Sequence, residues 1–460
     1  MSRFKPRADS AVSSTEPAMA IQGAAAAATA TLDLRPSVAP PVFVDNDERP
    51  TLFQNIGLIV LFGYQISAVL NDIAMRLFGA KAYVSVVALV LLPVLLVISG
   101  GLFRGLRHYA GWLWVGFFVC MLAAGAFSFF HRGSLDLILY YLPRSYVLYF
   151  YVTAFALSVR SLSRFMYVMI IADALLLISC RTSGYLASDG RFQIFSSFWG
   201  NSNDLALALL IAAVQFIYLI RTPRMLARIL GCVGFLGCLF YMSRTGSRGA
   251  MLALGAAMIS MFFMTKRKVR FIVLATPAFA AFFLFASGAT LRRLVTLGTT
   301  VTGNEDLGAV ASQMSREQLF LSSIDITLHH PLVGIGPGQF AAYYFADVTS
   351  KGGWTGWLGT HNSYTQVSSE CGIPALICYS GVLFTCLFLA FRMYRRSVDV
   401  PPLEEINRLS FILATALVVY AVATFFFHMA YTGLLPSLAG TTVALYLASR
   451  KMFAKFEIKL

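Results

Sequence analysis

A single histidine stands where a long polar segment meets an apolar run. It lies in Thr360-His361-Asn362-Ser363-Tyr364, and the segment ends at Glu370-Cys371-Gly372-Ile373-Pro374. Because imidazole has a pKa near physiological pH, His361 is a candidate for chemistry at the membrane surface. A helix over 361–371 would place His361 and Tyr364 on one face. The alternative is that His361 only caps that helix.

Two arginines lie between two apolar runs, in Ser243-Arg244-Thr245-Gly246-Ser247-Arg248-Gly249-Ala250-Met251-Leu252. An arginine at the centre of a bilayer costs about 2.5–3.5 kcal/mol, so both must lie at the interface or be paired. Arginines that only anchor a helix prefer the cytoplasmic side, whereas this connection falls on the other side. Guanidinium groups bind diphosphate through paired hydrogen bonds. We therefore expect Arg244 and Arg248 to bind an anion, with snorkelling anchors as the alternative.

Polar residues also open another apolar run on the same side. Gly200-Asn201-Ser202-Asn203-Asp204 fits helix capping and equally a sugar site, and both interpretations stay open. Gly334–Gly338 predicts a structural bend, because Pro337-Gly338 is typical of a type II turn. No strand precedes it, so it is not a nucleotide-binding fingerprint. No metal-ligand cluster or P-loop is evident, so we predict neither a metal nor a cofactor; His329-His330 is a weak metal candidate.

Two ionisable residues fall inside the apolar runs themselves. Asp173 and His428 are each predicted to be buried hydrogen-bonding residues. Ionisable groups within a membrane often mark functional sites, so a functional role stays open for both.

The elements that must position these residues are membrane helices. Hydrophobic residues make up 58% of the 460 residues and charged residues 12%, and the mean hydropathy is +0.72. Apolar runs of about 18 residues can cross a bilayer. The runs lack the alternation of barrel strands, so the sequence predicts an all-α polytopic membrane protein. Its approximately twelve predicted spans are 53–70, 82–99, 111–130, 145–159, 165–180, 203–220, 227–243, 249–264, 270–287, 373–391, 409–430 and 432–448.

The basic charge of the chain indicates its orientation. The net charge is +15, and 24 of the 36 Lys and Arg residues fall on one side when the predicted spans alternate. The richer side is cytoplasmic by the positive-inside rule, so both termini are expected inside. The charge therefore predicts contact with lipid headgroups of the bilayer, and no nucleic-acid partner is expected.

The polar stretches divide the chain. The first residues are rich in Ala, Pro, Ser and Thr and have no apolar stripe, as in disordered segments. One long loop leaves the membrane on the outer side, and such loops are usually functional. Its stretch Ser315–Leu328 is amphipathic. The expected parts are a disordered cytoplasmic tail (1–51), a membrane domain in two parts (52–287 and 372–449), a partly helical functional loop on the outer side (288–371) and a basic cytoplasmic tail (450–460).

Four short features follow one another on the predicted outer side. They are Gly-x-x-Asn at Gly200–Asn203, Ser-Arg-Gly-Ala at Ser247–Ala250 within Arg-x3-Leu, an Arg316-bearing helix that runs into Pro331–Gly338, and His-Asn-x-Tyr at His361–Tyr364 with Glu370 and Gly372 after it. In order and spacing the set resembles the bacterial O-antigen ligase and O-antigen/exopolysaccharide polymerase superfamily, over residues 52–448. An aromatic commonly follows the loop arginine in that family, whereas Leu319-Phe320 stands here.

The resemblance implies a glycosyltransferase of the bacterial inner membrane with its active site on the periplasmic face. It implies a metal-independent transfer of a glycan from undecaprenyl pyrophosphate to a sugar hydroxyl. The acceptor would be a glycan or a lipopolysaccharide core, and a polysaccharide export complex is a further partner. The implied catalytic residues are His361, as base or acceptor-orienting group, and Arg248. The implied substrate-binding residues are Arg244 and, in second rank, Arg316, with Asn203, Asn362, Tyr364 and Glu370.

Two other classes of function remain open. A transporter or flippase of lipid-linked glycans would use an arginine-lined groove without a base, and a scaffold of an export complex would need no site. A transporter predicts functional charges on both sides of the membrane, whereas the unexplained polar residues cluster outside, which favours the enzyme. Ligation and polymerisation use the same donor, and the sequence does not separate them.

Overall fold

The computed structural model describes residues 50–79, 83–188, 190–195, 199–285, 307–353 and 355–458. These residues belong to one unit of the chain, 43–460. The predicted tail at 1–51 lies almost wholly outside the described residues, as does the 288–306 part of the predicted loop.

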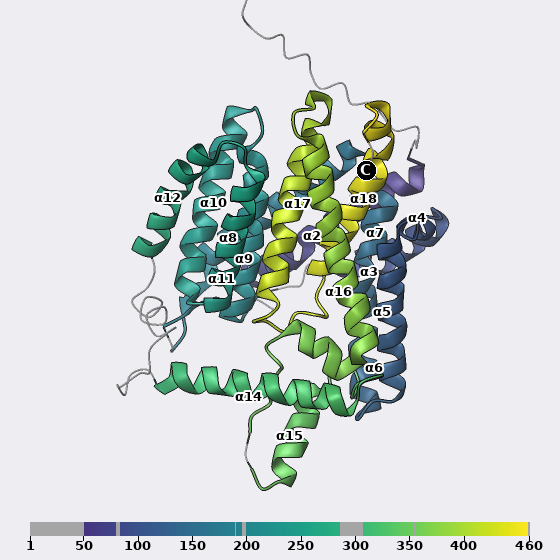
Figure 1. Cartoon of the computed structure of the whole chain (residues 1–460), viewed down its shortest axis with the longest axis vertical. Coiled ribbons are helices and arrows are strands. Elements are labelled where there is room, and N and C mark those ends of the chain that lie inside the picture. Colours follow the sequence, from purple (N-terminus) through teal and green to yellow (C-terminus); the bar gives the residue numbers. More distant parts are fainter. Residues whose placement is uncertain are drawn as a thin grey trace, which may run out of the picture. The chain divides into compact units, whose positions relative to one another are not determined.

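Helices form at each of the predicted spans (Figure 1). The first begins at Thr51, whose hydroxyl accepts from the Gln54 N–H at 3.3 Å while the Gln54 side chain accepts from the Thr51 N–H at 2.9 Å. This capping box satisfies two N–H groups that the helix leaves open. The helices are α2 (Leu52–Phe78), α3 (Val84–Ile98), α4 (Leu102–Gly105), α5 (Tyr109–Ala126), α6 (His131–Tyr141), η1 (Leu142–Tyr146), α7 (Leu148–Phe155), α8 (Val159–Ser183), α9 (Ser202–Ile220), α10 (Met225–Thr245), α11 (Arg248–Met264), α12 (Lys268–Phe285), α14 (Leu307–His329), α15 (Phe340–Ser350), α16 (Ser363–Ser397), η3 (Pro401–Leu403), α17 (Glu404–Ala423) and α18 (Leu434–Lys455).

Six described helices are long and apolar enough to cross a membrane, or seven if the bent α2 counts as one span. The prediction of an all-α polytopic membrane protein is thereby confirmed as a class, and the count of about twelve spans stays a prediction. One predicted span differs clearly. Residues 145–159 contain η1 and α7, and α7 has only 8 residues, about 12 Å of helix against a hydrocarbon core of about 30 Å. α7 alone is therefore too short to cross.

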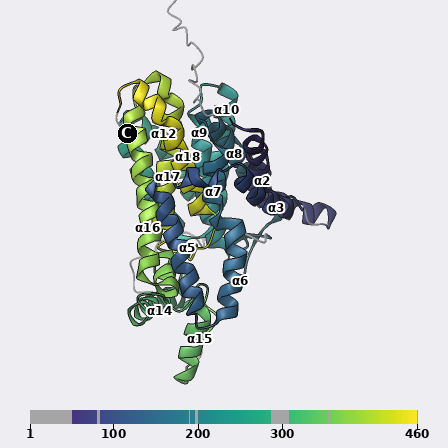
Figure 2. The ribbon, with the colours of Figure 1, turned by 90° about the vertical axis from the view of Figure 1, so that its right-hand side faces the viewer.

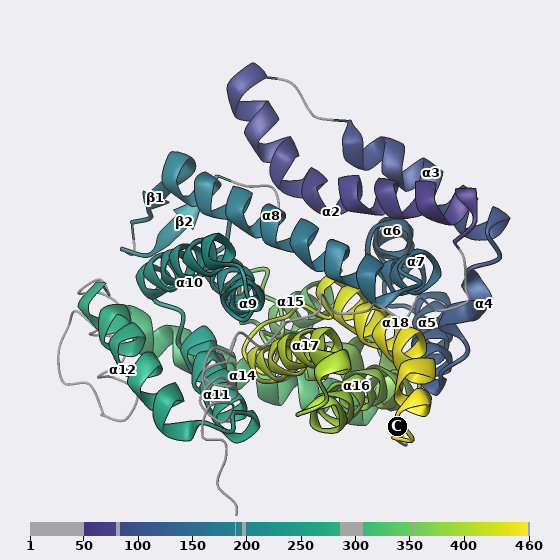
Figure 3. The same cartoon turned by 90° about the horizontal axis from the view of Figure 1, so that it is seen from above.

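Two helices form the centre of the bundle. In the most apolar stretch of α9, 83% of residues are buried, and in that of α17, 72%, against 28% for α10. α9 packs against α10 and α17, and α16 packs against α5 and α17. Figure 3 shows α2 and α3 as an outer layer beside α8 and α7. α9, which begins at Ser202, and α17, which ends at Ala423, are thus the most enclosed of the candidate spans.

A break divides α16 where the sequence predicts a helix to stop. Gly372 has φ 84° and ψ 170° inside the element, and Pro374 follows it. A Cβ on Gly372 would lie 2.3 Å from the Leu332 carbonyl oxygen, so this close approach of two backbones requires glycine. The Ile373 N–H donates to the Pro331 carbonyl at 2.8 Å. The short helix predicted over 361–371 therefore exists as the first segment of α16, but it begins at Ser363 and leaves His361 outside it, so His361 and Tyr364 do not share a helix face as predicted.

α14 lies across one end of the bundle, and α15 follows on its far side (Figures 1 and 2). The predicted amphipathic stretch belongs to α14, whose Leu319 and Ile326 are buried with Ile335 and Phe340 in a small separate core. The hydroxyls of Thr327 and Ser368 lie 2.8 Å apart and join α14 to α16.

A short hairpin interrupts the helical pattern and was not predicted. β1 (Gly184–Leu186) pairs antiparallel with β2 (Phe192–Ile194) between α8 and α9. It places Arg191 directly before β2, beside the start of α9.

Candidate active site

A polar cavity of about 540 Å³ opens where three separate segments meet. The segments are the hairpin and the start of α9, the middle of α14, and the residues before α16. The cavity is lined by Arg191, Gln193, Gly200, Asn201, Asn203, Arg316, Leu358 and His361. The structure thus brings together three of the predicted site residues, namely Asn203, Arg316 and His361, from distant parts of the chain.

His361 is held in an unusual backbone conformation at the edge of this cavity. Its φ is 51°, in the left-handed region that few residues other than glycine adopt. The next residue, Asn362, provides the helix cap, since its side chain accepts from the N–H groups of Tyr364 at 2.9 Å and Thr365 at 3.1 Å. Capping therefore explains Asn362 and not His361, and strained residues of this kind concentrate at functional sites.

The first turn of α16 also fixes the connection between α17 and α18. The Ser363 N–H donates to the Thr424 carbonyl at 2.8 Å, its hydroxyl donates to the Phe427 carbonyl at 2.6 Å, and the Met429 N–H donates to that hydroxyl at 2.7 Å. Tyr364 adds a bond from its hydroxyl to the Ala421 carbonyl at 2.9 Å. These bonds hold the connection against the segment that carries His361.

The connection brings a second histidine to the site. The rings of His361 and His428 lie 5.2 Å apart between centroids, at 77°. The sequence placed His428 inside a span at 409–430. That placement is wrong, because α17 ends at Ala423 and His428 lies in the connection that follows.

The surroundings of His361 lower the pKa of its imidazole to about 4, mainly by burial and further by the neighbouring His428 and Arg316. The pKa near neutrality expected from the residue type alone therefore does not hold for His361. At neutral pH the ring is therefore uncharged, with a lone pair that can accept a proton. Burial and positive neighbours both disfavour the imidazolium, which explains the direction of the shift.

A second arginine of the cavity escaped the sequence analysis. Arg191 donates from Nη2 to Oδ1 of Asn203 at 2.6 Å and from Nε to the Thr245 carbonyl at 2.8 Å. Asn203 is only 8% exposed, while Asn201 caps α9 by accepting from the Asn203 N–H at 2.8 Å. Within the Gly-x-x-Asn pattern, Asn201 thus caps α9 and Asn203 orients Arg191. The available signal in the sequence was that Arg191 falls on the predicted outer side, where few basic residues are expected.

The predicted pair Arg244 and Arg248 lies beside the cavity and is not among its described lining residues. Arg244 lies in the last turn of α10 with its guanidinium 5.6 Å from the Phe240 ring centroid, and Arg248 begins α11. The turn between them is tied to the cavity through the bond from Arg191 to Thr245. A Cβ on Gly249 would lie 2.6 Å from Phe426, so the start of α11 also packs on the connection that carries His428.

Glu370 serves the fold around the site. Its carboxylate accepts from the Gly338 N–H at 2.8 Å and the Phe340 N–H at 3.3 Å, and it is only 3% exposed. Its carbonyl accepts from the Gly336 N–H at 2.9 Å. A Cβ on Gly334 would lie 2.4 Å from the Glu370 carbonyl carbon. The Gly334–Gly338 bend is therefore docked on α16, which makes Glu370 a positioning residue for the loop.

Within the described ranges, no three His, Cys, Asp or Glu side chains are grouped so that they could hold a metal ion. His329, the weak candidate, has its Nδ1 at 2.9 Å from the Asp325 carbonyl of its own helix.

These features define a multi-pass helical membrane protein with a polar cavity at one end of its helices. Residues 233–380 match the protein-family model described as O-antigen ligase. The resemblance to the O-antigen ligase and polymerase superfamily is thereby confirmed. The matched residues include Arg244, Arg248, Arg316 and His361, whereas Arg191 and His428 lie outside them. No curated protein matches the chain.

Proposed function

We propose that this protein is an O-antigen ligase-like glycosyltransferase of the bacterial inner membrane. It moves a glycan from undecaprenyl pyrophosphate to a sugar hydroxyl at the periplasmic face, without a metal ion. The observation that carries the proposal is the cavity in which an uncharged His361 lies with two arginines, Arg191 and Arg316. One group can accept a proton there, and two can stabilise a leaving anion.

The reaction forms one glycosidic bond, breaks the bond from the glycan to the pyrophosphate, and moves one proton. The acceptor oxygen attacks the anomeric carbon of the donor glycan, and the bond from that carbon to the pyrophosphate oxygen breaks. The hydroxyl proton goes to His361, and undecaprenyl pyrophosphate leaves with the electron pair of the broken bond. Fixed guanidinium groups are suited to the charge that develops on the leaving oxygen.

The four arginines contribute to pyrophosphate binding in two different positions. Arg191 and Arg316 line the cavity and bind the pyrophosphate. Arg248 and Arg244, ranked first by sequence, lie at the adjoining turn and supply charge to the same anion from its border. The hydrogen bond to Asn203 fixes the orientation of the Arg191 guanidinium group, so Asn203 positions the anion site.

Donor binding also activates the base. The positive neighbours of His361 contribute to its low pKa, and a bound pyrophosphate brings opposite charge. Nearby opposite charge favours the imidazolium, so the pKa of His361 rises when the donor is bound. His361 then becomes a stronger base only in the complex that needs it.

The test is product formation by purified protein given lipid-linked repeat units, with and without a lipopolysaccharide core acceptor. A glycan joined to the core identifies a ligase, and longer lipid-linked chains identify a polymerase. Movement of intact lipid-linked glycan across vesicles, with no new glycosidic bond in either reaction, would identify a transporter and overturn the proposal. Export-complex partners would then be sought by co-purification.

A further inference from the structure

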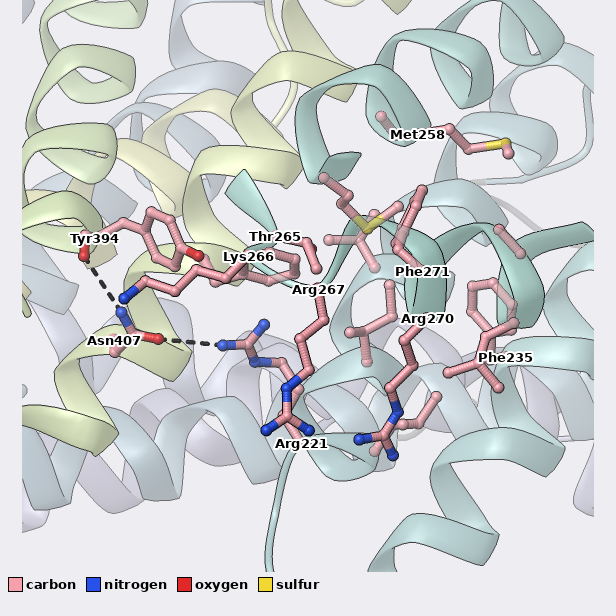
Figure 4. Close-up of a pocket in the computed structure, with 18 of the residues that line it drawn as sticks. Arg221, Phe235, Met258, Thr265, Lys266, Arg267, Arg270, Phe271, Tyr394 and Asn407 are labelled. Atoms are coloured by element: carbon pink, nitrogen blue, oxygen red, sulfur yellow. Dashed lines mark hydrogen bonds between the residues drawn. The ribbon is translucent and has the colours of Figure 1, made fainter. Parts of the chain in front are cut away.

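A second and larger cavity lies at the opposite end of the same helices (Figure 4). α9 begins at Ser202 beside the candidate active site and ends near Arg221 at this second cavity. Its 19 residues span about 28 Å at 1.5 Å per residue. The two cavities are therefore separate sites.

The body of this cavity is apolar. Its volume is about 1280 Å³, and its walls come from α9, α10, α11 and α12, with the ends of α16 and α17. Leu239, Leu254 and Phe271 are among its lining residues. Cavities for small molecules usually measure about 300–1,000 Å³, so this one suits a larger apolar ligand such as an acyl chain.

Basic side chains gather at one side of the cavity. The lining includes four basic residues, Arg221, Lys266, Arg267 and Arg270, against two acidic ones, Asp399 and Glu404. Figure 4 shows the four basic side chains on one side of the cavity, with Phe271 and Phe235 next to Arg270. The excess of positive charge next to an apolar body suits a ligand with an anionic head and an apolar tail.

Two of these four basic side chains have partners within the protein. Lys266 pairs with Asp399, and Arg221 donates to Oδ1 of Asn407 at 3.1 Å. Arg267 and Arg270 are exposed, and within the described part of the chain their side chains have neither an ion pair nor a hydrogen bond. Arg267 directly precedes α12 and Arg270 lies in its first turn, and their side chains lie near each other in Figure 4, so the two can approach one phosphate together.

We propose that this cavity binds one anionic glycerophospholipid. Its acyl chains lie among α9, α10, α11 and α12, and its phosphate is held by Arg267 and Arg270. Guanidinium groups bind phosphate oxygens through paired hydrogen bonds, and basic pockets between membrane helices on the cytoplasmic side suit anionic headgroups. The predicted topology places this end of the helices on that side.

The experiment is native mass spectrometry of the full-length protein in detergent, titrated with phosphatidylglycerol or phosphatidylcholine. The wild type should retain one phosphatidylglycerol in preference to phosphatidylcholine. Replacing both unpaired arginines, in R267Q/R270Q, should weaken phosphatidylglycerol binding by about 30-fold, equivalent to about 2 kcal/mol at about 1 kcal/mol per basic residue. Phosphatidylcholine binding should change little, because the apolar body is intact.

A matched variant separates this site from general surface charge. R395Q/R396Q removes the same charge from two exposed arginines at the end of α16 that do not line the cavity, and it should change binding less than threefold. Met258→Trp fills the apolar body and should weaken both lipids, with thermal unfolding checking that the variant is folded. Equal losses in the two double variants, or no preference of the wild type for phosphatidylglycerol, would overturn the proposal. Displacement by millimolar inorganic phosphate would assign the arginines to free phosphate instead.

Discussion

The imidazole rings of His361 and His428 meet edge to face, 5.2 Å apart between centroids. One ring precedes α16 and the other follows α17, and Ser363 joins the two segments through three hydrogen bonds. The contact disfavours protonation of His361, because a second imidazolium so close would repel it. An uncharged ring at neutral pH is what the proposed proton transfer requires.

Replacement of His361 tests its role as base. His361→Ala should lower turnover by about 10²–10⁴-fold, the usual range for a positioned acid–base group. Donor binding should persist, because the arginines provide charge recognition. Turnover and donor binding are measured on purified variants at matched protein levels.

Asn362→Ala is the matched control for that experiment. It removes the helix cap, which stabilises by about 1 kcal/mol, and keeps the imidazole. Its melting temperature should fall while most of the turnover remains. Near-wild-type turnover in His361→Ala would reject the base assignment, and lost donor binding would move His361 to the anion site.

The pH dependence of kcat/KM reports the pKa of the free enzyme. Because His361 must be unprotonated and its pKa is about 4, activity should stay level from neutrality down to about pH 5 and fall below it. His428→Gln removes one of the causes of the low pKa, so the acidic limb should move to higher pH. If the acidic limb of the wild-type profile lies near pH 6.5, the ordinary pKa of histidine, the low pKa assigned to His361 is wrong.

The fold class followed from the sequence because apolar run length is a local property. Each predicted span has a helix, and the break at Gly372 followed from a glycine and a nearby proline. The end of α17 was missed for a local reason too. Phe425, Phe426 and Phe427 keep the hydropathy high beyond Ala423, so a sliding window continued the helix through a connection.

Only those residues of the candidate site that lie in short sequence motifs could be predicted. Asn203, Arg316 and His361 were each singled out by sequence, and the structure places them around one cavity. Arg191 and His428 could not be placed in this way. A hairpin positions the first and the Ser363 hydrogen bonds position the second, and such long-range contacts leave no periodic signal in a sequence.

The orientation of the chain is tested with a reporter fused after Ser350. We expect the 288–371 segment outside and both termini inside, because 24 of 36 basic residues fall on the other side of the predicted spans. A periplasm-active reporter should give signal there, and a cytoplasm-active reporter should not. The reverse pattern would invert the predicted topology and place the candidate active site in the cytoplasm.

Metal removal tests the proposed chemistry. Chelation of purified protein should leave turnover unchanged, because the proposed proton transfer and leaving-group stabilisation use only His361 and arginines. Restoration of lost activity by one specific divalent metal would contradict this mechanism and direct attention to His329 and His330.

The sequence singled out Arg248 as the main binding group for the pyrophosphate, whereas the structure places Arg191 in the cavity, and substitutions distinguish the two. Arg191→Ala should weaken donor binding by about 10–100-fold, as expected when charge-assisted hydrogen bonds of about 1.5–3 kcal/mol are lost. Arg191→Lys should also be impaired, since an ammonium cannot keep the bonds to Asn203 and Thr245 while facing the anion. Asn203→Ala should reproduce part of the defect by releasing the guanidinium.

Arg248→Lys should be strongly impaired if Arg248 supplies charge at the border of the site, and Arg248→Ala should be worse. Donor binding and product formation are measured for each variant in the same preparation. If both Arg248 variants act like wild type while Arg191→Ala fails, Arg248 is an anchor and the cavity arginines alone bind the pyrophosphate. If the Arg191 variants bind donor normally, the hairpin arginine has only a structural role, and the anion site must be centred on the turn between α10 and α11.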